Sequence, residues 1–556
     1  MTQAALPETV LGRFDGSTIA SKGLNYRVFQ EDGHFMAEMP DPDVMMYVVQ
    51  GGKKLADKDI PRVRRPVVMA TGSHHYQTYW VTSPRYEGLM QTLPLVYLPK
   101  EAQWIPREEA FMNGPSHGQR FITQWNHHCI RCHSTEGNPG LDAKTGMLKS
   151  TVGEFGIACE SCHGPGESHV RKHSNPISRY LQHFSAKPDP TIVNPARLDH
   201  DRGSQVCGQC HGVYVMRDEF AMASANQGPM YHPGEDIHRT RYYIQHPQRD
   251  PKPERLADQK RNPDFFRERW WDDGTILAGG REYTALKDSA CFTKGKMSCM
   301  TCHSMHQSDP NDQLATGMDG PAACITCHQE PKYTTQVSTH TFHEPGSTGS
   351  NCLNCHMPHT TYALFSAIRS HQIQSPHADS SARFGTPNAC NLCHLDRTLA
   401  WTQDNLVNRY GHRPVTLSRE QQDTSAALLW LIQGNAAQRV IAAWHVGWEP
   451  AQKTSGADWL APFQSQLLAD PYGVVRYVAV RSLRTLPAYT NFQYSFLAPT
   501  TELSHRVELA LAQWSWVTNQ AERRSEKLLD AQGKVDTARL QRLLSTRDNR
   551  AVTIKE

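Results

Sequence analysis

The pattern of hydrophobic and polar residues changes twice along the 556-residue chain. Residues 1–115 contain four short β-favouring runs, VMMYVV, RPVVMA, YQTYWVT and LPLVYL, which Gly, Pro and Asp interrupt. Short runs rich in Val, Tyr and Trp and bounded by turn residues predict strands. We therefore expect a small β-rich N-terminal domain over residues 1–115.

Residues 401–556 show helical spacing of apolar residues in DTSAALLWLIQGNAAQRVIAAWHVG and in LLADPYGVVRYVAVRSLRTLP. We expect an all-α C-terminal domain here. One segment resembles a HEAT-type repeat, in which Asp-Pro starts the second helix and an arginine follows near its beginning. A plain helical bundle is an equally good interpretation. The residues of the repeat-like segment are Asp470, Pro471, Val475, Arg476, Ala479 and Leu483.

Residues 116–400 contain all fifteen cysteines, and fourteen of them form seven copies of the motif CxxCH. Chance alone would produce far less than one such match in a chain of this composition. The motifs are Cys129, Cys132 and His133; Cys159, Cys162 and His163; Cys207, Cys210 and His211; Cys299, Cys302 and His303; Cys324, Cys327 and His328; Cys352, Cys355 and His356; and Cys390, Cys393 and His394.

This motif is the attachment signature of c-type haem, in which both thiols form thioethers and the histidine is the proximal iron ligand. Two intervening residues let one helical turn present both sulfurs, and the next residue points its imidazole at the iron. A disulfide framework, a zinc site or an iron–sulfur cluster would not require a histidine after every pair. The sequence therefore predicts seven covalent c-type haems.

The spacing of the motifs predicts how the middle region is organised. The interval from Cys207 to Cys299 is much longer than the others, which favours a group of three haems followed by a group of four. So little polypeptide per cofactor implies that the haems form the core. We expect a mostly α and irregular haem-cored domain over residues 116–400, with short helices and long loops.

Histidines outside the motifs supply candidates for the second, distal iron ligand. We expect most haems to be bis-histidine, because a saturated iron transfers electrons without binding substrate. His169 follows the small-residue turn of GPGESH, and His306 follows the fourth motif closely in CHSMH. Three further candidates are His340, His343 and His371. For His75, His128 and His232, a surface position or a hydrogen bond to a haem propionate competes with ligation.

Composition limits the remaining classes of function. The chain is 38% hydrophobic with a formal net charge of +3, and no apolar run approaches the roughly 18 residues of a membrane span. Seven haems would add about fourteen negative charges from their propionates, so nucleic-acid binding has no support. Covalent haem attachment implies export to the periplasm or beyond, with the signal peptide absent from this numbering. Cys291, outside the motifs, is either a buried inert thiol or a haem-adjacent reactive one.

Several motifs together resemble an exported multihaem cytochrome family whose members often append HEAT or tetratricopeptide repeats. They are GIACESCHGPGESH, CGQCHG, KMSCMTCHSMH, the segment from His340 to Pro358, and TPNACNLCHLD. More distantly, CESCHGPG is similar to the superfamily of nitrite reductase and hydroxylamine oxidoreductase. Reductases of that superfamily carry a lysine-ligated catalytic haem in a CxxCK motif, which this chain lacks.

Two functions follow from these observations. The first is electron transfer through a chain of low-spin haems, with redox proteins as partners. The alternative is an oxidoreductase acting on a small nitrogen or sulfur oxyanion at one five-coordinate haem, for which no catalytic residue is assigned. Anion-binding and proton-donating groups for it lie between the third and fourth motifs: Arg239, Arg241, Tyr242, Tyr243, His246 and Arg281. These side chains could instead bind propionates or solvate an insertion.

A third hypothesis makes assembly the main role. The N-terminal β region and the C-terminal helices would then dock partners or further copies in an electron-conducting complex. Under this hypothesis, the helical region over residues 401–556 is the expected docking element.

Overall fold

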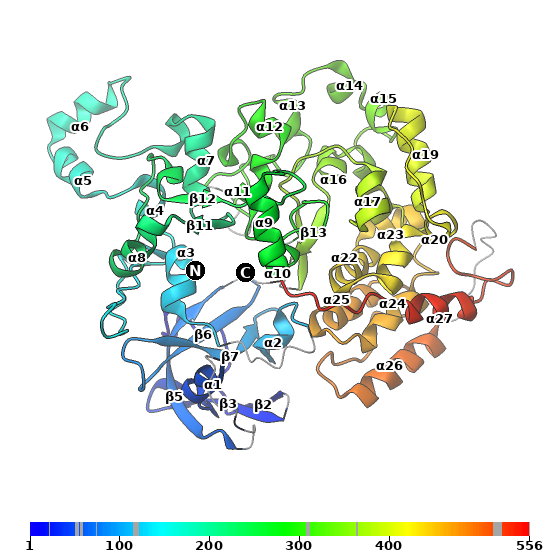
Figure 1. Cartoon of the computed structure of the whole chain (residues 1–556), viewed down its shortest axis with the longest axis horizontal. Helices are drawn as coiled ribbons and strands as arrows, with labels where there is room; N and C mark the ends of the chain where they lie inside the picture. Colours follow the sequence, from blue (N-terminus) through cyan, green and yellow to red (C-terminus); the bar gives the residue numbers. More distant parts are fainter. Residues whose placement is uncertain are drawn as a thin grey trace. The chain divides into compact units, whose positions relative to one another are not determined.

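Figure 1 shows the computed structural model of the chain. It describes residues 1–21, 23–49, 55, 59–73, 75–114, 122–277, 279–306, 308, 312–362, 365–514 and 525–554. The chain forms two compact units, each built from segments that are distant in sequence. Unit 1 comprises Met1–Glu108, Gly118–Ile244 and Lys294–Gln313, and unit 2 comprises Glu109–His117, Gln245–Thr293 and Leu314–Glu556.

The N-terminal part of unit 1 is an eight-stranded antiparallel sheet. Strands β2 to β8 pair in sequence order, and β1 pairs with β5. Strands form over three of the four β-favouring runs, because each places buried apolar side chains against one core. The strands are β1 (Thr2–Ala4), β2 (Thr18–Ser21), β3 (Leu24–Glu31), β4 (His34–Pro40), β5 (Arg62–Thr71), β6 (Gln77–Thr82), β7 (Met90–Leu98) and β8 (Gln103–Pro106).

The fourth run, VMMYVV, forms helix α1 (Pro42–Val49) instead of the predicted strand. Pro42 has the fixed backbone angle of a first helical residue. Asp41 precedes it, and its carboxylate accepts the Asp43 amide at 3.0 Å while its carbonyl accepts the Met45 amide at 3.1 Å. These start signals outweigh the β propensity of the apolar residues that follow.

Aromatic side chains fill the core between the sheet and the N-terminal loop. The ring of Phe14 lies 5.5 Å from that of Tyr79 and 5.2 Å from that of Trp104, both in edge-on orientation. The Tyr79 hydroxyl donates to Gln77 and accepts the Gly12 amide at 2.7 Å. The loop before the first hairpin is therefore fixed by both packing and hydrogen bonds.

The rest of unit 1 consists of short helices, two-stranded sheets and loops. Its small strands are β9 (Ser134–Thr135), β10 (Glu154–Phe155), β11 (Tyr214–Met216) and β12 (Arg241–Tyr243). Its helices are η2 (Trp125–Cys129), α3 (Ile130–His133), α4 (Glu160–His163), α5 (Glu167–His173), α6 (Pro176–His183), η3 (Pro195–Arg197), α7 (His200–Gly208), α8 (Asp218–Gln227), η4 (Ile237–Arg239) and η5 (Cys299–Thr301).

Unit 2 begins with short helices and one hairpin and continues into longer helices. Short α2 (Arg107–Ala110) lies where the chain passes from unit 1 to unit 2. The hairpin is β13 (His359–Tyr362) and β14 (Ser366–Arg369). The helices up to the hairpin and the last motif are α9 (Pro253–Arg261), α10 (Pro263–Arg267), α11 (Glu282–Lys287), α12 (Ala290–Thr293), α13 (Ala322–Ile325), α14 (Pro331–Thr334), α15 (Val337–Thr341), η6 (Thr348–Ser350), α16 (Cys352–His356), α17 (Ala378–Phe384) and α18 (Ala389–Cys393).

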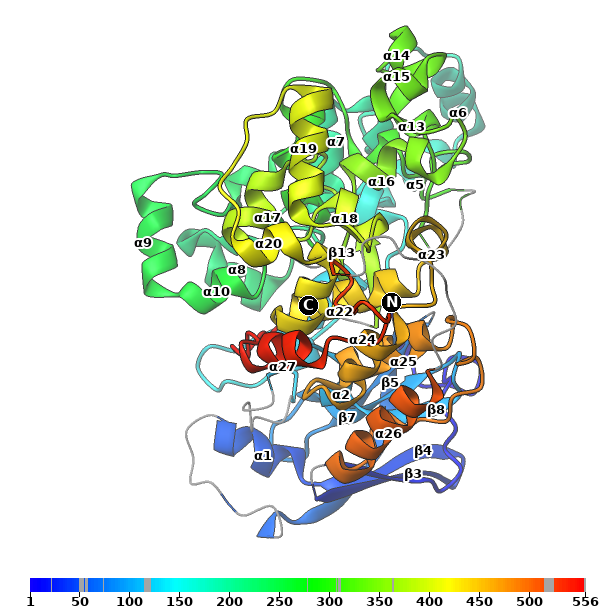
Figure 2. The same ribbon diagram turned by 90° about the vertical axis from the view of Figure 1, so that its right-hand side faces the viewer.

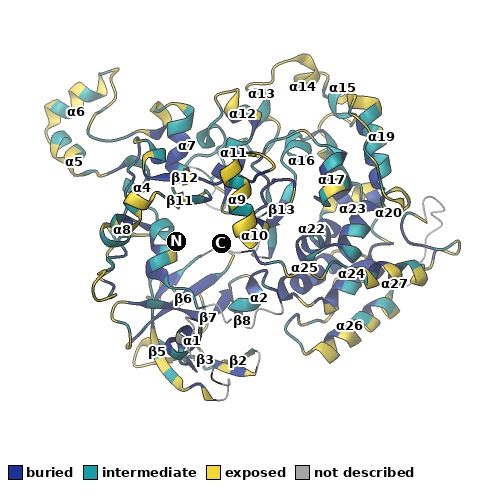
Figure 3. Cartoon of the chain, viewed as in Figure 1, coloured by how far each residue is buried: buried dark blue, intermediate teal, exposed yellow. Residues whose placement is uncertain are grey.

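The C-terminal part of unit 2 is helical. The helices are α19 (Leu399–Tyr410), α20 (Arg419–Asp423), α21 (Ala426–Leu428), η7 (Leu429–Gln433), α22 (Ala436–Val446), α23 (Glu449–Ser455), α24 (Ala461–Ser465), η8 (Gln466–Ala469), α25 (Gly473–Leu483), α26 (Thr500–Gln513) and α27 (Thr537–Ser545). Helices α24, α25 and α26 lie side by side (Figure 2). Helices α22 and α25 are largely buried, whereas α26 exposes one face (Figure 3).

A buried ion pair joins α22 to the start of α25. Asp470 accepts two hydrogen bonds from the Arg439 guanidinium, at 2.7 and 3.2 Å, and both side chains are at most 1% exposed. The Arg476 guanidinium donates to the Asp470 carbonyl at 2.7 Å. The Asp-Pro step and its arginine therefore fix how these two helices pack. Within the described residues, no helix is both long and apolar enough to cross a membrane.

Two buried histidines of unit 2 should make the stability of the fold fall at acidic pH. Burial lowers the pKa of His445 to about 3 and that of His359 to about 2. In the unfolded chain both titrate near 6.5, so their contribution is complete above that pH and is lost as the pH falls toward 3. At pH 4.5 we expect a loss of about 2–3 kcal/mol per histidine.

Thermal unfolding of the holoprotein between pH 7 and pH 4.5 checks this expectation. His445→Gln should lose less stability over this range than the unmodified protein. The matched control is His505→Gln, because the side chain of His505 is 61% exposed. Equal slopes for the His445 variant and the unmodified protein would contradict the assignment.

Candidate haem centres

The seven CxxCH motifs fold as tight helical turns. In the motifs that end at His163, His211, His303, His328 and His394, the histidine amide donates to the carbonyl of the first cysteine, with N···O distances of 2.8–3.0 Å. All fifteen cysteines lie in the described ranges, and none of them is paired in a disulfide. The backbone therefore presents both sulfurs and the imidazole from one turn, as haem attachment requires.

Helix α7 brings the second, third and fourth motifs together in unit 1. Gln209, inside CGQCH, donates through Nε2 to the Ser161 carbonyl inside CESCH at 2.8 Å. The Cys299 amide of CMTCH donates to Ser204 Oγ on α7 at 3.3 Å. The predicted grouping of three motifs and then four is therefore wrong. Unit 1 holds four and unit 2 holds three, because the chain returns to α7 after the long interval.

Cysteines of different motifs also meet. The Cys132 and Cys210 thiols share a hydrogen bond, which lowers the pKa of Cys132 to about 7 and raises that of Cys210. In unit 2, a hydrogen bond with Cys324 lowers the pKa of Cys352 to about 6. Cys207 and Cys299 form a third such pair. These contacts join the first motif to the third, the third to the fourth, and the fifth to the sixth.

Three motif histidines face a histidine from elsewhere in the chain. In two of the pairs the ring planes are nearly parallel. The ring centroids lie 6.1 Å apart with planes at 7° for His163 and His306, 6.2 Å apart at 5° for His356 and His340, and 6.1 Å apart at 38° for His394 and His343.

These spacings fit one iron held between two imidazoles. A metal–imidazole bond is about 2 Å long, and the ring centroid lies about 1 Å behind the nitrogen, so two trans imidazoles have centroids about 6 Å apart. Rings in direct contact would lie closer, as His169 and His173 do at 4.6 Å. Of the distal candidates, the structure brings His306, His340 and His343 opposite motif histidines.

Backbone carbonyls orient several of these rings. His163 Nδ1 lies 2.7 Å from the carbonyl oxygen of Val193. His356 Nδ1 lies 3.0 Å from the carbonyl oxygen of Gln374. His303 makes the same contact to the Asp312 carbonyl at 3.1 Å. A carbonyl can only accept a hydrogen bond, so Nδ1 carries the proton and Nε2 is available to a metal. Any residue can supply such a carbonyl, so the sequence gives no sign of it.

The other distal candidates lie in different surroundings. His169 packs against His173 and Asp189, and His371 Nδ1 contacts the Arg369 carbonyl at 3.1 Å. His75 and His128 are exposed, and His128 Nδ1 lies 3.2 Å from the Gln124 carbonyl. His232 Nδ1 lies 3.9 Å from the Glu136 carboxylate. Their assignment as distal ligands stays a prediction.

The residues predicted to bind an anion or donate a proton belong to two different units. Arg239, Arg241, Tyr242 and Tyr243 belong to unit 1, whereas His246 and Arg281 belong to unit 2. Arg241 is buried, with its guanidinium 4.4 Å from the centroid of the Tyr214 ring, and it donates to the Gln209 carbonyl at 3.2 Å.

Arg241 and Arg131 both favour the thiolate of Cys132 and so lower its pKa, in addition to the bond from Cys210. Sequence reasoning missed Arg131 and Tyr214. They lie more than 80 residues apart, and no local pattern joins them.

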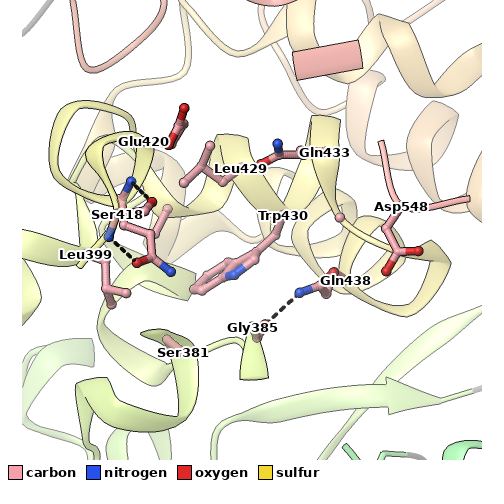
Figure 4. A pocket seen from close by; sticks show the side chains of 13 residues that line it. Ser381, Gly385, Leu399, Ser418, Glu420, Leu429, Trp430, Gln433, Gln438 and Asp548 are labelled. Atoms are coloured by element: carbon pink, nitrogen blue, oxygen red, sulfur yellow. Dashed lines mark hydrogen bonds between the residues drawn. The ribbon is translucent and has the colours of Figure 1, made fainter. Parts of the chain in front are cut away.

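Two remaining features of unit 2 are Cys291 and a cavity, and the role of Cys291 stays a prediction. Cys291 is half-buried, and desolvation raises the pKa of its thiol. Trp430 lines a cavity of about 310 Å³ in unit 2 (Figure 4). Its polar lining is engaged internally: Gln438 donates to the Gly385 carbonyl at 2.7 Å, and Gln421 accepts the Ser418 amide at 2.9 Å.

Comparison with known proteins agrees with the chemistry of these centres. Residues 290–333, which include CMTCH and CITCH, match the family model for a doubled CXXCH motif. A stretch of 291 residues, 49% of this chain, is 24% identical to the cytochrome c nitrite reductase subunit NrfA of Nitratidesulfovibrio vulgaris.

Together with the CxxCH motifs, these two matches support a multihaem c-type cytochrome. The similarity covers 42% of the NrfA subunit, so the cytochrome spans less than half the length of the curated relative it matches. No solved structure matches the cytochrome.

Mass spectrometry of the purified cytochrome should find seven covalently attached haems per chain. Replacing both Cys324 and Cys327 with serine should remove one haem, because neither thioether can form. Cys291→Ser is the matched control, and it should leave the count unchanged. A count below seven in the unmodified protein would show that at least one motif does not bind haem.

Proposed function

We propose that this cytochrome is an electron-transfer protein that binds seven c-type haems, most of them with two histidine ligands. The observation that supports the proposal best is the set of three histidine pairs with centroids 6.1–6.2 Å apart. Each bound haem supplies an iron that can take up and release one electron. Two imidazoles leave no coordination position for a substrate, so such a centre is suited to relay.

The packing of the motifs supports a continuous relay within each unit. Helix α7 contacts the second and fourth motifs through Gln209 and Ser204, and Cys210 of its own motif meets Cys132 of the first. We infer that the third haem is the common neighbour of the other three in unit 1. In unit 2 the hydrogen bond between Cys324 and Cys352 supports a fifth haem that neighbours the sixth.

We also propose that the chain is divided into a β-rich domain, a haem-cored domain and a helical C-terminal domain. We propose further that the protein is exported to the periplasm or beyond. The helical region supports the last motif directly, because Ser455 Oγ donates to the Cys393 carbonyl at 3.1 Å and accepts the Leu395 amide at 2.8 Å. We propose that its outer face docks redox partner proteins, whether its helices form HEAT-type repeats or a simple bundle.

A second candidate function is reduction or oxidation of a small nitrogen or sulfur oxyanion. The similarity to a nitrite reductase subunit favours it, as does the buried Arg241 beside Cys132 of the first motif. Burial lowers the pKa of His133, the motif histidine there, to about 4. The two arginines near this motif would hold an anion, and Tyr214 could donate a proton.

Low-temperature EPR of the oxidised holoprotein separates the two functions. Spectra are recorded alone and with nitrite, hydroxylamine or sulfite. For a dedicated carrier we expect only low-spin signals that no addition changes. A high-spin signal that shifts with one addition would favour the enzyme and identify its substrate class. A spectrum dominated by high-spin signals would exclude the bis-histidine relay.

A further inference from the structure

Two histidines and an aspartate converge in unit 1, in the segment that follows the second haem motif. His169 and His173 lie one turn apart on α5, and Asp189 follows α6. Asp189 Oδ2 lies 3.1 Å from His169 Nδ1 and also contacts His173 Nε2. One possible ligand atom from each side chain lies within 4.8 Å of the other two.

The aspartate is held so that one oxygen faces the two rings. The Thr191 amide and hydroxyl donate to Oδ1 of Asp189 at 3.0 and 2.7 Å, and Lys172 Nζ donates to the same oxygen at 3.1 Å. Oδ2 is left for the imidazoles. The side chains of His173 and Asp189 are each 10% exposed, whereas that of His169 is 36% exposed. His173 and Asp189 therefore form the buried side of the cluster, and His169 forms the side that is open to solvent.

We propose that His169, His173 and Asp189 form a binding site for a divalent transition-metal ion, with zinc as the reference ion. Two imidazoles and one carboxylate are donors that zinc and its neighbours in the periodic table prefer. Histidines four residues apart on a helix present both rings on one face. Solvent completes the coordination on the open side. Lys172 and Thr191 hold Oδ1, so Oδ2 is the oxygen that faces the ion.

If His169 binds this metal ion, it does not serve as a distal haem ligand. Nδ1 of His169 is the nitrogen that faces Asp189, and it is the nitrogen that the metal takes. The sequence placed His169 among the distal haem ligands because of GPGESH alone. The structure pairs it instead with a helical neighbour and a carboxylate.

Zinc titration of the holoprotein by calorimetry tests the proposal. We expect one site whose affinity falls at least about tenfold in His173→Ala and in Asp189→Asn. His183→Ala is the matched control. His183 lies at the end of α6, in the segment between His173 and Asp189. It is exposed, and its ring packs against Phe184. The control should bind zinc as the unmodified protein does.

Two further measurements keep the test decisive if a variant misfolds. Zinc-edge X-ray absorption of the unmodified holoprotein with one equivalent of zinc should show two imidazole ligands and light oxygen ligands. His169→Ala should lose zinc affinity and keep every low-spin haem signal. Equal affinities in all variants, a different ligand set, or a low-spin signal lost from His169→Ala would each overturn the proposal.

Discussion

Replacing His306 with alanine should convert one low-spin haem of the holoprotein into a high-spin haem that binds carbon monoxide when reduced. His306 is the residue that faces His163 at 6.1 Å, so its loss opens the distal position of the second centre. The proximal ligand and both thioethers remain, and the haem count should not change. EPR of the oxidised protein and carbon monoxide difference spectra of the reduced protein measure the effect.

The same exchange at His340 should open the sixth centre in unit 2, where the facing ring is His356 at 6.2 Å. His183→Ala provides the control for both variants, since His183 is exposed. The pairing is wrong if both exchanges leave the number of low-spin signals as it was.

Asp470→Ala should destabilise the fold by about 3–5 kcal/mol. The carboxylate is fully buried and bonds Arg439, and Arg547 Nη1 lies 3.7 Å away. Removing it leaves the buried guanidinium of Arg439 and the partly buried guanidinium of Arg547 without their counter-ion, and this desolvation cost is the reason for the large effect. Chemical unfolding followed by far-UV circular dichroism measures the change.

Glu449→Ala is the matched control for this prediction. Glu449 pairs with Lys453 on the surface, and both side chains are more than 70% exposed, so the change should be within about 0.5 kcal/mol. Asp470→Ala combined with Arg439→Met should be less destabilising than Asp470→Ala alone. A loss no larger than that of the control would show that the buried pair does not support the fold.

Local features were predictable from the sequence, whereas long-range pairings were not. The helical turn of each CxxCH motif depends on five consecutive residues, so its spacing alone specifies the bond from the histidine amide to the first cysteine carbonyl. His306 shows the opposite case. It lies three residues after the fourth motif but faces the histidine of the second, and no sequence pattern encodes that partner.

The error at VMMYVV has a different physical cause. Six apolar residues satisfy the pattern of a buried strand and that of a short helix equally well, and the residues before them decide between the two. Pro42 and the side chain of Asp41 start α1. The grouping of the motifs failed for a related reason, because the length of a connection does not say where the chain returns.

The carbonyl contacts to the motif histidines have an evolutionary consequence. Because Val193, Asp312 and Gln374 contribute main-chain oxygens, substitutions at these positions can replace the side chain and keep the contact. The effect of these contacts on the reduction potentials should therefore persist when the amino acids at these positions change. The potentials should instead respond to insertions and deletions, which shift the loops that carry the oxygens. Relatives should therefore differ in potential where their loop lengths differ.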